Sequence, residues 1–412
     1  MSARCINLSD YSNLQSAIDA VPEYGTLFVP PGEWHCGAGR LKSNMTLFLA
    51  KGARLIAPKV LSEHVPWPEL GRQHLHNCCF LALYDLDNVT VAGEGIIDCS
   101  GHNFWSDYDH APSSISPRDP VSGRYAVRQY LPLPMRPSGI MMINSSNISI
   151  KGITVYDSAG FTVWALGCRQ VRLDGIAVDN IRRGPNTDAL DIDCSSDVWI
   201  TNCHLSAGDD CIALKSDIAL LGRNQPCERI HIANNTMTSQ CCGVRIGYEG
   251  DGEIRDVVMN NNIIYESNIG LDMLSVIPDQ HQKRKIFHGC RISNILVDNM
   301  IIRQVRQAIK LWSYVENEEM LSEHTGFIRN VSLRNMYIEA VNASFIGGKS
   351  VEDIFLKNIR MHVKRACRRS EAGEIVSIPS VWGDGYLPDP LTIYQVKNLT
   401  MENVRVTEEY SE

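Results

Sequence analysis

Two short acidic segments of the chain carry the residue types of acid–base chemistry. NTDALDID supplies Asp188 and Asp191, and AGDDCIALKS supplies Asp209, Asp210 and Lys215. Paired carboxyl groups can hydrolyse a glycosidic bond, because one protonates the leaving oxygen while the other activates a water molecule. The same residue types could instead bind calcium, which prefers several oxygen ligands, or form a solvated acidic surface. Which chemistry applies depends on whether the fold brings these side chains together.

A repeated phrase shows which elements must position the acidic segments. Each copy contains a polar pair, a β-branched residue, and alternating apolar and polar positions on both sides of an asparagine or glycine. In the central part of the chain the equivalent apolar position recurs at Ile148, Val171, Val198, Ile230 and Val257. Further copies begin near residues 87, 293, 329, 352 and 397. The intervals, 23 to 32 residues in the central part, are typical of one solenoid turn with loops of variable length.

The repeat predicts a parallel β-helix of about ten turns. Each copy reads as two short strands of period two, bent at a residue type that tolerates a left-handed backbone. One copy cannot bury its apolar face alone, so stacked turns must form a continuous core. The interval is too short for propeller blades, and the strand-only pattern disfavours helical repeats. We therefore expect an all-β fold with a single domain over residues 1–412.

An amphipathic segment near the N-terminus is expected to cover one end of this solenoid. Its apolar residues recur at helical spacing, at Leu14, Ala17, Ile18 and Val21. Asp10 or Ser12 could cap such a helix at its N-terminus. An uncovered solenoid end would expose strand edges, so residues 1–25 are expected to form an N-terminal cap region.

Stacked turns would bring the two acidic segments together. Asp188 and Asp209 are 21 residues apart, close to one turn, and neighbouring strands lie about 4.8 Å from one another. Asp188 should therefore lie near Asp209 and Asp210. Crowded carboxylates repel one another, so folding alone does not favour the cluster, and crowding raises the pKa of the acid.

Four longer interruptions are expected to form loops on the side of the solenoid and to shape a cleft. They cover residues 105–137, 276–291, 313–327 and 364–395. Aromatic residues in or beside them could stack on a sugar ring or pack in the core: Trp105, Tyr108, Trp312, Tyr314 and Trp382.

Composition excludes several other classes of protein. The chain has 412 residues, 44% hydrophobic and 21% charged, which is typical of a globular protein. Its net charge of −8 argues against a general nucleic-acid binder. No stretch approaches the roughly 20 apolar residues of a membrane span. We expect neither nucleic acid nor membrane as a partner, and the sequence leaves the oligomeric state open.

The N-terminal residues and the cysteines bear on location. MSARCINLSDYSNL lacks the apolar segment of a signal peptide, so we expect a cytoplasmic protein. The chain has 14 cysteines and no CxxC pair, which disfavours a structural zinc site. We expect most of them to be reduced, buried side chains.

Further motifs accompany the acidic segments: LQSAIDA, VPPGEW, LKSNMTLFLAKGARL and GEGIIDCSGHNFW. Together with NTD and DD at their spacing, they make most of the chain resemble glycoside hydrolase family 28, the polygalacturonase family of right-handed parallel β-helices. The resemblance implies inverting hydrolysis without a metal or organic cofactor. It assigns Asp209 as the general acid, and Asp188 and Asp210 as the residues that hold the attacking water. Asp191, which follows NTD in the family pattern, is expected to contribute to substrate binding.

Two positions depart from the family pattern and bear on the substrate. Cys242 stands where the family has the histidine of a GHG motif, and a thiol is a much weaker donor. Ala308-Ile309-Lys310 aligns with the family's RIK motif, so Lys310 is retained while the arginine that could clamp a uronate is lost. Arg245, close to Cys242, could partly replace that arginine or be an exposed strand residue.

We therefore expect an inverting, exo-acting glycosidase that removes α-linked galacturonic acid or a related sugar from pectin-derived oligosaccharides. Lys310, Arg245, Cys242 and Asp191 are the candidate substrate-binding residues. One alternative is a family 28-like hydrolase for a sugar other than galacturonate. Two others are a calcium-dependent polysaccharide lyase and a non-catalytic sugar-binding β-helix.

Overall fold

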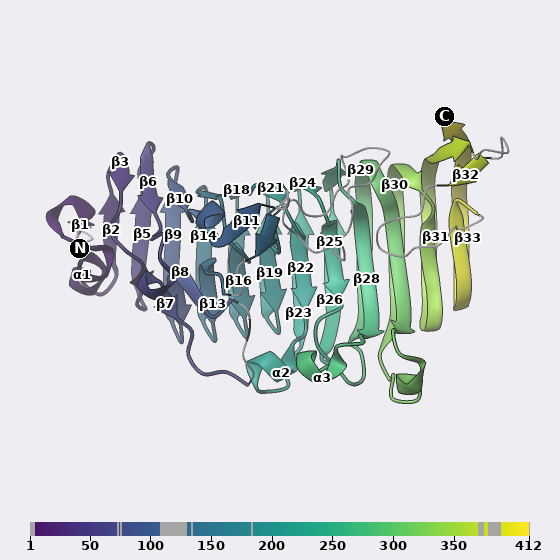
Figure 1. The fold of residues 1–412 in the computed structure, drawn as a ribbon, viewed down its shortest axis with the longest axis horizontal. Coiled ribbons are helices and arrows are strands. Elements are labelled where there is room, and N and C mark those ends of the chain that lie inside the picture. Colours follow the sequence, from purple (N-terminus) through teal and green to yellow (C-terminus); the bar gives the residue numbers. More distant parts are fainter. Residues whose placement is uncertain are drawn as a thin grey trace.

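The protein is a solenoid of parallel strands stacked along one axis (Figure 1). The computed structural model describes residues 5–71, 74, 76–107, 130–132, 135–182, 184–369, 375–377 and 389–411. Within the solenoid, equivalent strands of successive turns pair with one another in parallel. This arrangement confirms the predicted all-β, right-handed parallel β-helix.

Three faces of parallel strands enclose the core. The face that carries the acidic segments contains β4 (Gly39–Arg40), β8 (Cys78–Tyr84), β13 (Ser138–Ile143), β16 (Val163–Leu166), β19 (Leu190–Asp193), β22 (Ile212–Lys215), β25 (Cys242–Gly247) and β28 (Ile269–Ile277). The second face contains β1 (Cys5–Asn7), β2 (Gly25–Val29), β5 (Met45–Leu49), β9 (Asp87–Gly93), β14 (Ser146–Lys151), β17 (Arg169–Asp174), β20 (Ser196–Thr201), β23 (Cys227–Ala233) and β26 (Glu253–Asn260). The third contains β3 (Gly32–Trp34), β6 (Ala53–Ile56), β10 (Ile96–Asp98), β15 (Thr154–Tyr156), β18 (Ala177–Asp179), β21 (His204–Ala207), β24 (Thr236–Ser239) and β27 (Ile263–Tyr265).

Toward the C-terminus the strands become long enough to run around the corners between faces. They are β29 (Arg291–Val315), β30 (Phe327–Asn342), β31 (Ser344–Arg369) and β33 (Leu391–Ser411). Short strands lie outside the solenoid: β7 (Val65–Pro66) pairs antiparallel with β8, β11 (Trp105–Asp107) with β12 (Tyr130–Pro132), and β32 (Ile375–Ser377) with β31.

The core consists of columns of apolar side chains, one from each turn. Ile192, Leu214, Ile246, Met273 and Leu311 are paired in register on successive strands of the first face, and all are buried. Each such side chain contributes about 1.5–3 kcal/mol of hydrophobic stabilisation. The alternate residues of the same strands point outward, where they can form a site.

Asparagines form the corners, as the repeat predicted. Asn202, Asn234 and Asn261 occupy the same corner of successive turns with φ near 57°, 60° and 56°. Their side chains form a ladder of hydrogen bonds between turns. Asn234 Nδ2 donates to Asn202 Oδ1 at 3.2 Å, and Asn261 Nδ2 donates to Asn234 Oδ1. The left-handed backbone and the ladder both favour asparagine at this position.

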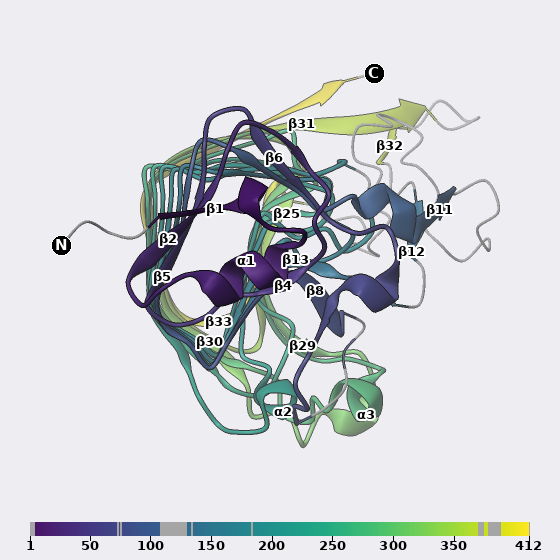
Figure 2. The ribbon, with the colours of Figure 1, turned by 90° about the vertical axis from the view of Figure 1, so that its left-hand side faces the viewer.

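The predicted N-terminal helix is present and covers the end of the solenoid, as Figure 2 shows. α1 (Leu14–Ala20) buries Leu14 and Ile18 against the core. The predicted cap is corrected, because Asn13 rather than Asp10 or Ser12 accepts the hydrogen bond from Ser16 N. Asp10 belongs instead to a 3-10 turn, η1 (Leu8–Asp10).

Three of the predicted loops begin later than expected, because strand pairing between turns continues into them. β28 extends to Ile277 and β29 to Val315, and these two residues pair with each other. β31 likewise extends to Arg369. The remaining loops carry α3 (His281–Arg284) and η5 (Glu318–Met320), and α2 (Ile218–Leu221) follows β22. Two more 3-10 turns are η2 (Leu61–Glu63) and η3 (Gly101–Phe104). In the described part of the chain no helix has the length and apolar character needed to cross a membrane.

Candidate active site

Successive turns of the solenoid present the acidic residues at one corner of the first face. Asp188 precedes β19, and Asp209 and Asp210 precede β22. The backbone ladder continues through this corner, because Ala189 N donates to Asp210 O at 2.8 Å and Leu190 N to Cys211 O at 3.0 Å. The regular stacking of the two turns therefore holds the carboxyl groups side by side.

The three carboxyl groups form a compact cluster. One oxygen atom from each of Asp188, Asp209 and Asp210 lies within 4.8 Å of the other two. Asn186 Nδ2 lies 3.3 Å from Asp209 Oδ2, and the buried Arg136 donates to Asn186 Oδ1 at 3.1 Å. The structure thus brings together the residues whose 21-residue spacing suggested proximity, and Asn186 orients one of them.

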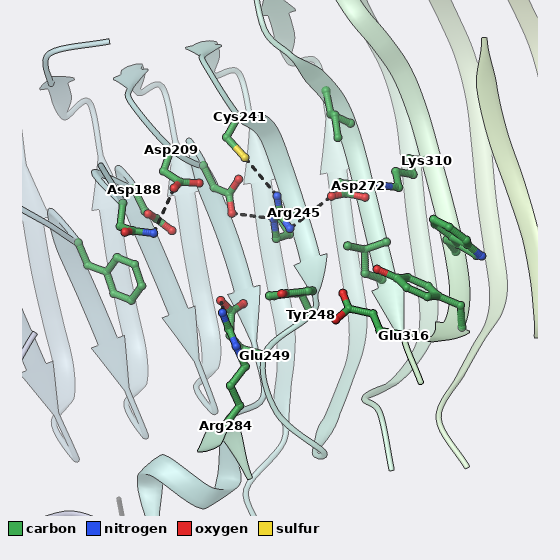
Figure 3. Close-up of a pocket in the computed structure, with 17 residues that line it drawn as sticks. Asp188, Asp209, Cys241, Arg245, Tyr248, Glu249, Asp272, Arg284, Lys310 and Glu316 are labelled. Carbon is green, nitrogen blue, oxygen red and sulfur yellow. Dashed lines mark hydrogen bonds and ion pairs between the residues drawn. The ribbon is translucent and has the colours of Figure 1, made fainter. Parts of the chain in front are cut away.

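Arg245 is the cation that compensates one side of this cluster. Its Nε lies 2.8 Å from Asp210 Oδ2, and its Nη1 lies 3.5 Å from Asp272 Oδ2. Its Nη2 also donates to the sulfur atoms of Cys241 at 3.2 Å and Cys242 at 3.0 Å. Figure 3 shows the Arg245 side chain directed toward Cys241 and Asp272. Arg245 is therefore an integral part of the site wall and not an exposed strand residue.

Lys215 compensates the other side from behind the cavity. Its Nζ lies 2.7 Å from Asp191 Oδ1 and 3.5 Å from Asp188 Oδ2, and it rests 3.8 Å from the ring centre of Phe161. Burial alone would lower the pKa of Lys215, but the surrounding carboxylates, Asp191 foremost, raise it well above its ordinary value. One cation thus faces two buried carboxyl groups.

Burial raises the pKa of most carboxyl groups in this region. The pKa of Asp188 lies well above its ordinary value, because burial and then Asp191 penalise its negative charge. Burial raises the pKa of Asp191 to about 7 against the opposing effect of Lys215, and that of Asp210 to about 6 against the opposing effect of Arg245. Near neutral pH the region therefore retains protons that isolated aspartates would release.

On the strands that follow the cluster toward the C-terminus, residues paired in register carry charges of alternating sign. Arg245 in β25 pairs with Asp272 in β28, which pairs with Lys310 in β29. Beyond Lys310, Trp312 and Tyr314 stack with ring centres 4.0 Å apart. Because every second residue of a strand points outward, these side chains form the floor of the site.

A cavity of about 310 Å³ lies over this floor. Its lining consists of Phe161, Asn186, Asp188, Asp209, Asp210, Cys241, Arg245, Tyr248, Glu249, Ile269, Asp272, Leu274, Arg284, Lys310, Trp312, Tyr314 and Glu316. This volume is at the lower end of the range for small-molecule pockets, which run from about 300 to 1,000 Å³. The cavity can hold a small part of a sugar chain directly beside the three carboxyl groups.

The cluster also has the donor atoms of a metal site. The oxygens of Asp188, Asp209 and Asp210 are close enough together to hold one cation. Asp210 forms a second such group with Cys241 and Cys242, but burial raises the pKa of the Cys242 thiol to about 12. A protonated thiol is a poor ligand, so the oxygen cluster is the better candidate of the two.

The proposed substrate-binding residues lie at two depths. Lys310 and Arg245 line the cavity, whereas Cys242 and Asp191 are fully buried behind its wall. Cys241, the neighbour of Cys242, lines the cavity instead. Cys242 Sγ lies 3.6 Å from Asp272 Oδ2, so it contacts the wall network rather than the cavity.

Sequence reasoning missed several lining residues, among them Tyr248, Asp272 and Arg284. For Asp272 a signal was present, because GVRI, GLDM and AIKL are equivalent phrases on successive turns and place Asp272 between Arg245 and Lys310. Tyr248 and Arg284 belong to loop regions without a repeat, and no pattern points to them.

The aromatic candidates divide in the same way. Trp312 and Tyr314 line the cavity, whereas Trp105 donates from Nε1 to Ala159 O and does not line it. Tyr108 and Trp382 lie outside the described residues. The described thiols are free, and most are buried, as expected.

Comparison with known proteins gives concordant matches of sequence and fold. Residues 72–351 match the model of glycosyl hydrolases family 28. A relative from Vitis vinifera, named a probable polygalacturonase, is 24% identical over 381 residues, which cover 86% of this chain and 71% of the relative.

Two solved structures share the fold. The hyperthermoactive exopolygalacturonase of Thermotoga maritima superposes with a TM-score of 0.70 at 20% identity, covering 88% of this chain and 87% of that one. The family 28 exopolygalacturonase of Yersinia enterocolitica gives a TM-score of 0.68 at 16% identity, covering 97% and 78% of the two chains.

Proposed function

Because this chain belongs to family 28 of the glycosyl hydrolases and is a glycosidase, we propose that it hydrolyses α-linked galacturonic acid or a related sugar in pectin-derived oligosaccharides. The observation that carries the proposal is the cluster of three carboxyl groups within 4.8 Å of one another on a cavity. The name of the Vitis vinifera relative supports a pectin-type substrate.

In this proposal Asp209 is the general acid, and Asp188 and Asp210 hold the attacking water. Asp209 is the most exposed of the three, at 8% against 3% and 4%, which suits the group that must reach the leaving oxygen. Among the described residues, Asp188 Oδ1 and Asp210 Oδ1 have no hydrogen-bond partner. Two unpaired carboxylate oxygens on neighbouring turns can accept both hydrogens of one water molecule.

The pH dependence of the reaction should follow the protons that Asp188 and Asp210 hold beside the general acid. Burial raises the pKa of both Asp188 and Asp210, so the cluster retains a proton near neutral pH. Carboxyl groups this close share their protons, and the pH profile reports the cluster as a whole. We expect activity to fall above neutrality as the last shared proton leaves.

We propose inversion of the anomeric centre, on the strength of the family. The separation of the carboxyl oxygens, under 4.8 Å, is shorter than the roughly 6.5–9.5 Å usual for inverting enzymes. Proton NMR of the first-formed product tests this point directly. A retained anomer would indicate a covalent intermediate and overturn the proposed role of the water.

Exo action is proposed from the closed N-terminal end of the cavity. Trp164, which pairs in register with Asp191, points outward and is nevertheless fully buried. Trp67, from the segment that follows β7, packs on it with ring centres 4.8 Å apart, and Phe161 packs on it at 4.8 Å. We infer that this edge-to-face aromatic cluster blocks the path of a longer sugar chain on that side.

Replacing Trp67 by Ala tests the closed end. The variant should begin to cut internal bonds of long chains, which chromatography of the early products would reveal. A wild-type enzyme that already releases products of mixed length would refute exo action.

The deciding experiment for the proposed function is Asp209→Asn. Loss of the general acid should lower kcat by at least about 10²-fold while the circular dichroism spectrum stays unchanged. Asp85→Asn is the matched control, because Asp85 is exposed and its φ of 57° suits asparagine. Near-wild-type activity of Asp209→Asn would refute the assignment.

The same cluster could serve a cation-dependent lyase, and the assay separates the two. A lyase would lose activity on chelation and form unsaturated products that absorb in the ultraviolet. A non-catalytic protein would bind sugars without any turnover. The hydrolase we propose keeps its activity in EDTA and forms saturated products.

We further propose that the enzyme acts in the cytoplasm on short oligosaccharides. The described thiols are free, and a reducing compartment keeps them so. Subcellular fractionation tests the location, and recovery of the enzyme outside the cytoplasm would contradict it.

A further inference from the structure

The wall of the cavity beyond the catalytic cluster carries charges that already neutralise one another. In register, Asp272 stands between Arg245 and Lys310 on neighbouring strands. Arg245 in turn lies between Asp210 and Asp272. Positive and negative groups therefore alternate along the floor on which a sugar would lie.

Arg245 is committed to this wall and is poorly placed to clamp a uronate. Its guanidinium interacts with two carboxylates and donates to two thiols, and only 13% of its side chain is exposed. Turning it toward a substrate carboxylate would leave Asp210 and Asp272 buried without their cation. Such uncompensated buried charges are strongly unfavourable.

The lining as a whole is acidic. Six acidic residues (Asp188, Asp209, Asp210, Glu249, Asp272, Glu316) face three basic ones (Arg245, Arg284, Lys310), so the lining stays negative even when the catalytic cluster retains one proton. Lys215 lies behind the wall, within 4.0 Å of carboxylate oxygens of Asp188, Asp191 and Glu249. An ionised sugar carboxylate entering this cavity would meet like charges at short range, whereas an uncharged sugar would not.

The apolar part of the lining fits an uncharged ring. Trp312 and Tyr314 form a stacked pair, and Ile269 and Leu274 add aliphatic surface. Lys310 Nζ lies 5.4 Å from the ring centre of Trp312, so part of its charge is directed at an aromatic face. These groups offer contact area to the C–H face of a sugar rather than a site for a second anion.

We propose that the sugar unit held over Asp272 carries no ionised carboxylate. Two kinds of unit share this chemistry: a neutral hexose or deoxyhexose, and a uronate blocked as its methyl ester. Asp272 is the specificity-determining residue, because its carboxylate holds the Arg245 guanidinium in the wall and so keeps it from a substrate carboxylate. The proposal rests on the hydrolytic function proposed above and narrows its substrate class.

The test compares three α-linked substrates of matched length: an oligogalacturonate, its fully methyl-esterified form, and an oligosaccharide in which galacturonate alternates with rhamnose. At least one of the two partly or fully uncharged substrates should have a kcat/KM ten-fold or more above that of the oligogalacturonate. Their relative rates identify which uncharged unit is used. A preference for the ionised oligogalacturonate overturns the inference, while no hydrolysis of any of the three counts against the proposed function itself.

Asp272→Asn tests the residue. Removing this charge should raise the ratio of kcat/KM for the oligogalacturonate to that for the preferred uncharged substrate about ten-fold. Glu253→Gln, an acidic residue outside the cavity lining, is the control and should leave the ratio unchanged. If Asp272→Asn does not fold, Glu316→Gln at the edge of the same lining should shift the ratio in the same direction. An unchanged ratio in a folded variant overturns the role of these charges.

Discussion

Lys215 is the residue whose replacement most directly probes how the site is held. Its Nζ lies 2.7 Å from Asp191 Oδ1 and 3.5 Å from Asp188 Oδ2, and its side chain is only 3% exposed. Lys215→Met keeps the apolar stem on Phe161 and removes the charge. Two buried carboxyl groups would then share no cation.

The loss in the free energy of unfolding caused by Lys215→Met can be calculated from these distances. At an effective dielectric constant of about 20, the gross attraction is about 6 kcal/mol at 2.7 Å and about 5 kcal/mol at 3.5 Å. Most of this attraction offsets the free energy of desolvating the Lys215 ammonium group. The methionine variant has no ammonium group to desolvate. Removing one partner of a buried pair typically leaves a net loss of about 3–5 kcal/mol in the free energy of unfolding.

The loss should depend on pH, because a proton can replace the missing cation. Burial raises the pKa of Asp191 to about 7 even with Lys215 present, and removal of the lysine should raise it further. The carboxyl groups of the variant will therefore be neutral in acid. The destabilisation should be small near pH 5 and should grow by up to about 1.4 kcal/mol per pH unit toward pH 8.

Urea unfolding followed by tryptophan fluorescence and circular dichroism measures both effects. Lys51→Met is the control, since Lys51 forms an exposed pair with Glu94 at 3.6 Å and should contribute at most about 1 kcal/mol. Adding Asp191→Asn to Lys215→Met should recover part of the loss. The reasoning is refuted if Lys215→Met costs no more than Lys51→Met at pH 8.

Replacing Asp193 by Asn tests the pH dependence of folding at a second buried group. Burial raises its pKa from 3.8 to about 7, so between these values the native state holds a proton that the unfolded chain releases. Stability should fall by up to about 1.4 kcal/mol per pH unit as the pH rises through this window, and urea titrations should show a shallower fall in Asp193→Asn. Asn234→Ala should lower the free energy of unfolding by about 1–2 kcal/mol, because the φ of 60° at this position disfavours alanine. Asn234→Gly should lower it clearly less in thermal unfolding. Equal losses in the two variants would contradict the proposed role of the left-handed corner. Arg136→Lys should lower kcat by about ten-fold or more with little change in KM, because Arg136 holds Asn186 against Asp209. An unchanged kcat would show that this hydrogen-bonded support is dispensable.

The parts of the structure that repeat were predictable from the sequence. The asparagine corners and the alternating strands follow from a local pattern that occurs in every turn. The proximity of Asp188 and Asp209 follows from the same pattern, because residues one turn apart in the sequence lie on neighbouring strands in space. The N-terminal helix was predictable for a similar reason, since its apolar residues recur at helical spacing.

The parts that break the repeat were not predictable. Trp164 sits on an outward-facing position, where the pattern predicts exposure, and only the segment around Trp67 that folds back over it explains its burial. The depth of Asp191 and Cys242 depends on packing between turns and not on their own sequence context. The ion pairs of Arg245 likewise require the register of three strands, and no single stretch of sequence contains that register.

The one-dimensional order of the solenoid has a consequence for how the enzyme loses its activity. The strands of each turn pair only with those of the turns before and after it, so unfolding should begin at the ends and proceed inward. The catalytic turns, β19 to β28, lie well away from both ends in Figure 1. Their amide protons should therefore exchange last, and a molecule that has lost its terminal turns can still hold the carboxyl cluster in register.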